Sequence, residues 1–221
     1  MINRKDKKLV ILPPKTGTVS FESVFVNPFC GFEPYTRRGP NIIHMYIEEA
    51  IGFYNIQDIQ DWTIYQTARN PMDRVPSAFF HQKKMVNRDR EPVNVDFEYF
   101  VEYLNENRHI LTRKGKKIFE FYGPKDVPNT TRKQRNGGLR FYIPQTLWAN
   151  PDKYNVKYIK LGEDNSQVYA DMGLPEDLEI PHWNDGENGK NGYEYLHTDK
   201  TREIIKSLYE EDFLRINYEQ P

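Results

Sequence analysis

The chain has 221 residues, of which 38% are hydrophobic, 29% are charged and 14% are aromatic, and its formal net charge is −1. This length suits one sizeable core, and so many aromatic residues are typical of a folded chain rather than a disordered one. The near-neutral charge excludes a global field that attracts nucleic acid or an anionic membrane, so an anionic ligand needs a local basic pocket. We expect one α/β domain over residues 1–221 and no nucleic-acid partner.

The single cysteine, Cys30, excludes an internal disulfide and suits a reducing compartment. The apolar run at residues 9–12 is too short for a signal peptide or a membrane span. We therefore expect a cytoplasmic protein without stable membrane insertion.

The elements predicted in chain order alternate between strands and helices. Strands are expected at 8–12, 62–68 and 156–161, and helices at 19–25, 42–54, 72–84, 97–104, 164–173 and 200–214. Gly173 is expected to end its helix, and Asp199 to cap the last one. The basic, turn-rich stretch 112–140 is predicted to be a flap within an insertion at about 85–140. The alternation favours a P-loop-like three-layer fold, with a central parallel sheet flanked by helices and ligands at the carboxyl ends of the strands.

The first strand is followed by a motif suited to phosphate binding. Residues 9–20 contain a strand, a glycine turn and a helix start, so backbone N–H groups and the helix N-terminus can face an anion. Gly17 allows a close backbone approach, and Lys15 adds a charge. Hydroxyl donors are expected from Thr16, Thr18 and Ser20. In the Walker pattern glycine precedes Lys-Ser/Thr across a longer loop, so this is a different motif, or else an ordinary turn with a helix cap.

A second motif, Arg69-Asn-Pro-Met-Asp-Arg-Val-Pro-Ser77, follows the next strand. Arg69 can place two parallel hydrogen bonds on a phosphate. If the chain turns at Pro71 and becomes helical, Ser77 lies two turns into the helix with its hydroxyl towards the strand end. Arg69 and Ser77 are therefore predicted to hold a second phosphate. The alternative is that Arg69 and Arg74 are surface residues of a helix start.

In this order the two motifs resemble those of sulfotransferases that use 3′-phosphoadenosine 5′-phosphosulfate (PAPS), closest to the Golgi carbohydrate sulfotransferases and their bacterial relatives. Residues 14–20, Val19 included, are similar to the family's 5′-phosphosulfate loop, and residues 69–77 to its 3′-phosphate motif. Weaker similarities follow at 158–163, 180–184 and 208–218.

The resemblance implies PAPS as donor, adenosine 3′,5′-bisphosphate as product and a hydroxyl acceptor. It favours a glycan as acceptor, while a tyrosine side chain or a small alcohol stays open. Residues 85–140 lie largely outside the resemblance.

Sulfuryl transfer requires an in-line oxygen nucleophile, a base for its proton and cations at the leaving phosphate. Lys15 is the candidate for the leaving side. His44 is the candidate base, because it is expected to open a helix with Glu48 four residues later on the same face, where a carboxylate raises its pKa and orients the ring. The family often has a histidine at a similar place. Some relatives use a glutamate, so Glu48 or Glu49 is the alternative, and a helix-start histidine bonded to backbone is another.

Further contacts are predicted around these motifs. Arg135 in the flap is expected to close over the 3′-phosphate or meet an anionic acceptor, unless the flap is only a solvated loop. Gln145 and Trp148 are predicted sugar contacts, because aromatic faces suit pyranose rings. Glu163 is predicted to shape the acceptor cleft or to act as a structural cap. No His, Cys and Asp cluster has metal-ligand spacing, so no metal is expected.

Two other functions stay open. A P-loop small-molecule kinase needs a magnesium-binding Asp at the end of a neighbouring strand, where this chain has Arg69. A non-catalytic nucleotide- or glycan-binding module would bind nucleotide without acceptor-dependent turnover. The presence of Lys15, Arg69, Ser77 and a candidate base favours an enzyme.

Overall fold

The computed structural model describes residues 1–25, 31–33, 44–87, 96–111, 141–175, 177–180 and 192–219. The predicted flap at 112–140, with Arg135, lies outside these residues. The chain divides into two compact units, Met1–Arg69 with Gln145–Asp185 and Asn70–Pro144 with Gly186–Pro221. Across the described ranges, no helix has both the length and the apolar character needed to cross a membrane.

The first unit contains a four-stranded sheet. Its order is β1 (Ile2–Asn3), β2 (Lys8–Ile11), β3 (Thr63–Ala68) and β4 (Val156–Lys160). β2, β3 and β4 are parallel, and β1 pairs antiparallel with β2. The three predicted strands are thus confirmed, whereas the two-residue β1 is too short for a periodic signal. Because the three long strands are parallel, their carboxyl ends meet at one edge of the sheet.

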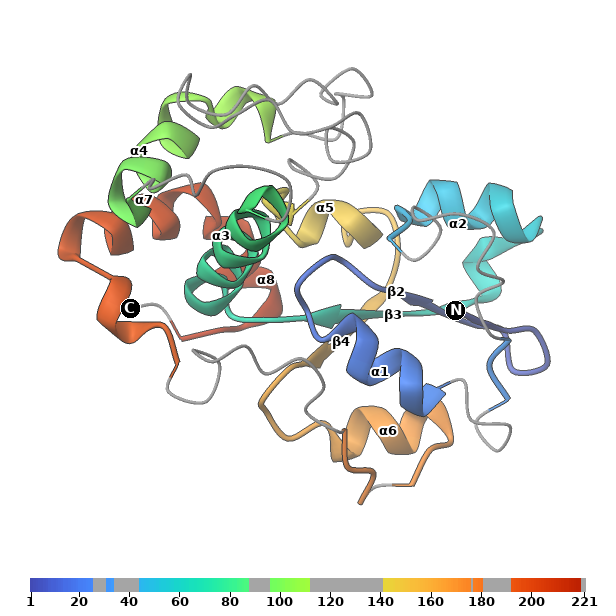
Figure 1. Cartoon of the computed structure of the whole chain (residues 1–221). Coiled ribbons are helices and arrows are strands. Elements are labelled where there is room, and N and C mark those ends of the chain that lie inside the picture. The colour runs from blue at the N-terminus through green and yellow to red at the C-terminus, as the bar shows by residue number, and fades with distance from the viewer. Residues whose placement is uncertain are drawn as a thin grey trace. The chain divides into compact units, whose positions relative to one another are not determined.

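Helices lie on both faces of this sheet. Figure 1 shows α1 (Thr18–Phe25) and α6 (Ser166–Met172) on one face, and α2 (Ile47–Tyr54) with α5 (Thr146–Ala149) on the other. On the α1 and α6 face, Val10, Tyr65 and Ile159 from the strands join a buried cluster with side chains of both helices. Strand residues of opposite parity are buried as well, namely Leu9, Ile11 and Ile64. Burial on both faces explains why residues 9–12 appear in the sequence as a continuous apolar run. β3 differs, because it also buries the polar residues Gln66 and Thr67.

The start of α2 differs from the prediction. The helix begins at Ile47, after Tyr46 in an extended conformation, and not at residue 42. The Glu49 carboxylate accepts the Tyr46 N–H at 2.9 Å, which satisfies one of the unpaired amides at the helix start. His44 therefore precedes the helix, and the predicted helix face shared by His44 and Glu48 is wrong.

Of two other predicted helix ends, the one at Gly173 is confirmed and the one at Asp199 is wrong. Gly173, with φ 73°, ends α6 as predicted, because glycine adopts the left-handed conformation without strain. The last helix is capped by Thr198 and not by Asp199, since Thr198 has the extended backbone and its side chain accepts from the Thr201 N–H. The predicted helix 200–214 is divided at Tyr209 into α7 (Asp199–Leu208) and α8 (Glu210–Ile216).

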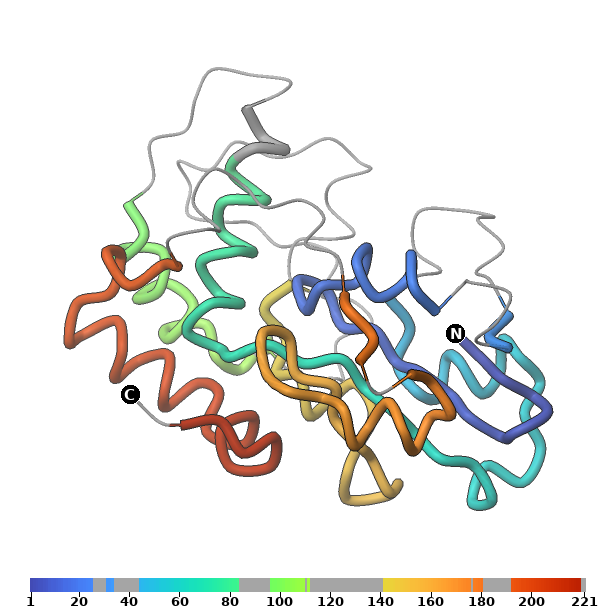
Figure 2. The backbone as a smooth tube through the Cα atoms, turned by 90° about the horizontal axis from the view of Figure 1, so that it is seen from below, coloured from blue at the N-terminus to red at the C-terminus, as the bar shows by residue number. Residues whose placement is uncertain are grey.

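The described part of the second unit is helical. Besides α7 and α8 it contains α3 (Pro71–Asn87), α4 (Phe97–Glu106) and the short 3₁₀ turns Arg108–Ile110 and Glu194–Leu196. α4 and α7 lie side by side in both views (Figures 1 and 2). The predicted helices 72–84 and 97–104 are confirmed with slightly different ends.

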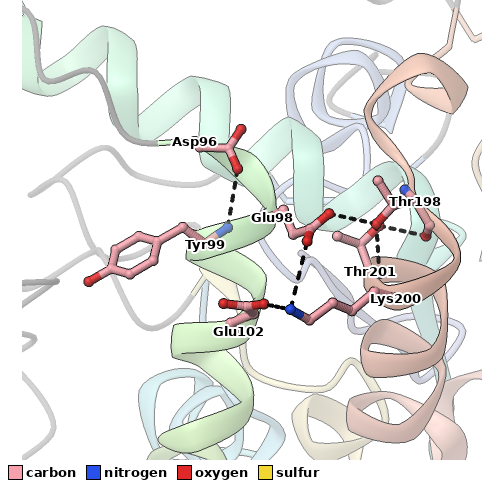
Figure 3. Close-up of polar contacts among 7 residues, drawn as sticks. All are labelled: Asp96, Glu98, Tyr99, Glu102, Thr198, Lys200 and Thr201. Atoms are coloured by element: carbon pink, nitrogen blue, oxygen red, sulfur yellow. Dashed lines mark hydrogen bonds and ion pairs between the residues drawn. The ribbon is translucent and has the colours of Figure 1, made fainter.

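Polar contacts join α4 to the start of α7 (Figure 3). The Thr198 hydroxyl donates to Glu98 at 2.8 Å while it accepts from the Thr201 N–H. The Lys200 ammonium pairs with Glu102, and lies 3.7 Å from a Glu98 oxygen. A carboxylate from α4 therefore supports the cap of α7, where negative charge interacts favourably with the helix dipole.

Candidate anion site at the carboxyl ends of the strands

The loop between β2 and α1 makes a tight turn. Lys15 and Gly17 have left-handed backbones, with φ 68° and φ 78°. The left-handed backbone favours glycine at position 17, and a Cβ there would also lie 2.9 Å from Cδ1 at the end of the Leu161 side chain, which would have to shift. α1 begins at Thr18, directly after this turn. The predicted succession of strand, tight loop and helix is confirmed.

The threonine hydroxyls of this loop are used inside the protein. Thr16 is fully buried, and its hydroxyl donates to the Pro13 carbonyl at 2.7 Å and lies 2.7 Å from the Thr67 hydroxyl on β3. The Thr18 hydroxyl donates to the same Pro13 carbonyl at 3.2 Å. The Thr16 hydroxyl therefore joins the loop to β3 and the Thr18 hydroxyl bonds within the loop, whereas both were predicted to donate to a phosphate. Ser20 is also buried, whereas Val19 in the first turn of α1 is 50% exposed.

Lys15 lies beside a second cation at this edge of the sheet. Burial and, to a smaller extent, the positive charge of Arg69 together lower the pKa of the Lys15 ammonium to about 8. Arg69 directly follows β3, the strand next to β2. Within the described ranges no carboxylate forms an ion pair with Lys15. Two like charges drawn partly out of water favour an anion between them, because the anion stabilises both charged forms.

Gln145 has a different role from the predicted sugar contact. Its side chain is fully buried, and its amide oxygen accepts the Arg69 N–H at 2.8 Å. Its amide nitrogen donates to the Arg69 carbonyl at 2.9 Å. Gln145 therefore holds the Arg69 backbone and has no surface to offer a sugar.

His44 is held against the end of β2. Its Nδ1 lies 2.8 Å from the Leu12 carbonyl oxygen. A carbonyl can only accept, so Nδ1 carries the proton and, in the neutral ring, Nε2 carries the lone pair that a general base requires. The Leu12 carbonyl thus orients the ring, a role that was predicted for Glu48, which is exposed on α2.

Trp148 anchors the segment that carries His44. It is fully buried in α5, and its ring stacks on Tyr46 with centroids 4.4 Å apart. Tyr46 is two residues after His44. Because Trp148 is enclosed, it packs this segment in place of the predicted sugar contact.

The end of β4 adds a charged pair at the same edge. Lys160, the last residue of β4, lies with its Nζ 3.1 Å from a Glu163 carboxylate oxygen. The Asn165 side chain closes the turn by bonding both backbone groups of Lys160. The Glu163 side chain is 44% exposed and stays a candidate for acceptor binding.

The second unit carries the remaining predicted residues. Ser77 lies on α3 and is 8% exposed, and its predicted contact with a phosphate stays a prediction. Arg74 is buried, which contradicts the alternative that it is a surface residue. Burial raises the pKa of the Tyr209 phenol, the Arg74 charge lowers it and the buried Asp212 raises it, so Arg74 lies among buried polar groups and has a structural role. Among the residues that the structure describes, no group of three or more possible metal ligands occurs.

The sequence did not indicate three of these contacts, namely the Thr16–Thr67 hydroxyl pair, the hydrogen bond between His44 and Leu12 and the two hydrogen bonds between Gln145 and Arg69. Each joins residues at least 32 positions apart. Local patterns carry no signal for such pairs.

Comparison of the chain with protein-family models, with curated proteins and with solved structures found no significant match.

Proposed function

We propose that the chain is a sulfotransferase that moves a sulfuryl group from PAPS to an acceptor hydroxyl. The observation that carries the proposal is the pair of cations, Lys15 and Arg69, at the ends of adjacent parallel strands. The tight β2–α1 loop beside them and the first turn of α1 contain residues 14–20, which resemble the 5′-phosphosulfate loop of the sulfotransferase family. PAPS carries phosphate groups at its 3′ and 5′ positions, so it offers an anionic group to each of these neighbouring cations.

The proposed roles follow from the chemistry of each group. Lys15 stabilises the charge that develops on the leaving phosphate oxygen as its bond to sulfur breaks. Arg69 holds the 3′-phosphate through its guanidinium. His44 Nε2 accepts the proton of the acceptor hydroxyl as the new sulfur–oxygen bond forms, because its Nδ1 is already bonded to the Leu12 carbonyl.

A glycan hydroxyl is the acceptor that the resemblance favours, and Glu163 is one described residue at this edge that has exposed polar surface for it. The single cysteine is compatible with the cytoplasm. A P-loop kinase is disfavoured because β3 ends in Ala68 followed by Arg69, where a kinase of this type needs a magnesium-binding carboxylate.

The proposal is tested by comparing adenosine 3′,5′-bisphosphate with adenosine 5′-monophosphate, which lacks the 3′-phosphate. The wild-type chain should bind the bisphosphate more tightly, and Arg69→Ala should abolish this preference. Arg69→Lys is the matched control, because it keeps the charge and loses only the two-point fork, so part of the preference should remain. If Arg69→Ala weakens both nucleotides equally, Arg69 does not read the 3′-phosphate.

A further inference from the structure

The backbone of Arg69 lies beyond the last paired residues of β3. Pairing of β3 with β4 reaches Ala68, whose carbonyl accepts the Leu161 N–H at 2.8 Å. Pairing of β3 with β2 ends earlier, at Gln66. A cation that binds a ligand through a directional fork needs a fixed backbone, and a strand partner is no longer present to fix it.

We propose that Gln145 is the positioning residue for Arg69. Its primary amide reproduces the donor and acceptor of a strand partner, with the oxygen 2.8 Å from the Arg69 N and the nitrogen 2.9 Å from the Arg69 O. Two opposed hydrogen bonds fix both the place and the orientation of this peptide unit. The inference rests on the proposed function only in assigning Arg69 to the 3′-phosphate.

Gln145 is itself held rigidly enough to perform this role. It is fully buried, and its own carbonyl accepts from the Gln66 side-chain amide at 3.0 Å. The next residue begins α5, whose Trp148 stacks on Tyr46 near His44. One short segment therefore supports both the candidate 3′-phosphate ligand and the candidate base.

The chemistry of the amide predicts how substitutions behave. Gln145→Leu removes both hydrogen bonds and leaves two partly buried backbone groups of Arg69 without this partner. Gln145→Glu has nearly the same shape, and its carboxylate accepts the Arg69 N–H but cannot donate to the Arg69 carbonyl. The glutamate variant should therefore lie between the wild type and the leucine variant.

The experiment measures two quantities in the wild type, Gln145→Leu, Gln145→Glu and the control Gln82→Leu. The first is the pKa of Lys15, followed by NMR of its side chain without ligand. The second is the ratio of dissociation constants for adenosine 3′,5′-bisphosphate and adenosine 5′-monophosphate. Gln82 accepts a hydrogen bond from the Tyr142 hydroxyl, so its loss tests a stability effect that does not involve Arg69.

We expect Gln145→Leu to raise the Lys15 pKa and to reduce the preference for the bisphosphate about tenfold, which corresponds to about 1.4 kcal/mol. Gln145→Glu should reduce the preference for the bisphosphate less than Gln145→Leu does, and Gln82→Leu should change neither quantity. The new carboxylate of Gln145→Glu raises the Lys15 pKa by itself, so only the nucleotide preference of this variant is compared. An unchanged Lys15 pKa in Gln145→Leu, or equal losses for both nucleotides, would overturn the proposal. Where Gln145→Leu fails to fold, the nucleotide preference of the near-isosteric Gln145→Glu decides whether Gln145 positions Arg69.

Failure of the proposed function gives a different result. If the wild-type chain shows no preference for the bisphosphate, the assignment of the 3′-phosphate fails. The Lys15 pKa comparison needs no nucleotide, so it still tests whether Gln145 positions Arg69.

Discussion

Binding of an anion at the β2–α1 loop should draw a proton onto Lys15. Burial and the neighbouring Arg69 lower the Lys15 pKa to about 8 in the free protein. A bound anion returns the pKa towards the ordinary lysine value of about 10.4. The proton uptake on binding should then be about 0.1 at pH 7, about 0.5 at pH 8 and about 0.9 at pH 9.

Calorimetry in pairs of buffers with different ionisation enthalpies measures this uptake directly, with adenosine 3′,5′-bisphosphate as ligand. The key values are those at pH 8 and 9, because phosphate groups with a second pKa of about 6 are then fully ionised and take up no protons themselves. The control is Lys15→Met, which keeps the length of the side chain and cannot be protonated. An uptake that does not rise between pH 7 and 9, or that persists in Lys15→Met, would refute the reasoning.

The same shift predicts a pH dependence of stability. The unfolded chain binds more protons than the folded one between pH 8 and about 10.4, so the Lys15 contribution to the free energy of unfolding rises with pH in this window. Lys15→Met should therefore be more stable than the wild type at pH 7, by roughly 3 kcal/mol, and the difference should shrink towards pH 10. Chemical denaturation of both proteins at several pH values measures it, and a difference that is constant with pH contradicts the assignment.

Three further predictions concern single positions. Gly17→Ala should lower the free energy of unfolding and weaken bisphosphate binding. The control is Gly162→Ala, at φ 85° with no atom within 4 Å of the added Cβ, which should show only a backbone strain of about 1–2 kcal/mol. Equal losses of stability in denaturation experiments would exclude a clash of the new Cβ with Leu161. His44→Ala should keep bisphosphate affinity and reduce the rate of bisphosphate release from PAPS about 10²–10⁴-fold with sugar acceptors. His44→Asn can still donate to the Leu12 carbonyl but lacks Nε2, so it should be equally slow. Retained turnover in either variant would assign the base to another residue. Thr198→Ala should lower the free energy of unfolding by about 1 kcal/mol, and Thr198→Ser should keep most of the wild-type stability, as measured by denaturation. Equal stability of Thr198→Ala and the wild type would show that the cap of α7 contributes nothing.

The parallel strands and the two motifs were predictable because their signals are local. The run at residues 8–12 is apolar because β2 is buried on both faces, and the polar turn with Gly17 follows it directly. Lys15 and Arg69 could likewise be placed at strand ends, since each follows a strand in the sequence. The effect of Arg69 on the Lys15 pKa then follows from β2 and β3 being neighbours in the sheet.

The start of α2 and the role of Gln145 were not predictable in the same way. Apolar residues continue with helical spacing before Ile47, so periodicity extends the predicted helix past its true start; the capping bond from Tyr46 to Glu49 decides the boundary. Gln145 bonds Arg69 from 76 positions away, and a polar residue after a turn-rich stretch looks exposed in the sequence. Tertiary contacts decide both cases.

The most direct test of the account is a calorimetric titration of the wild-type chain with adenosine 3′,5′-bisphosphate without metal, beside ATP with Mg²⁺. If the chain is a sulfotransferase, the bisphosphate binds tightly and ATP shows no comparable binding. Binding of ATP with Mg²⁺ alone would contradict the sulfotransferase proposal and favour a kinase.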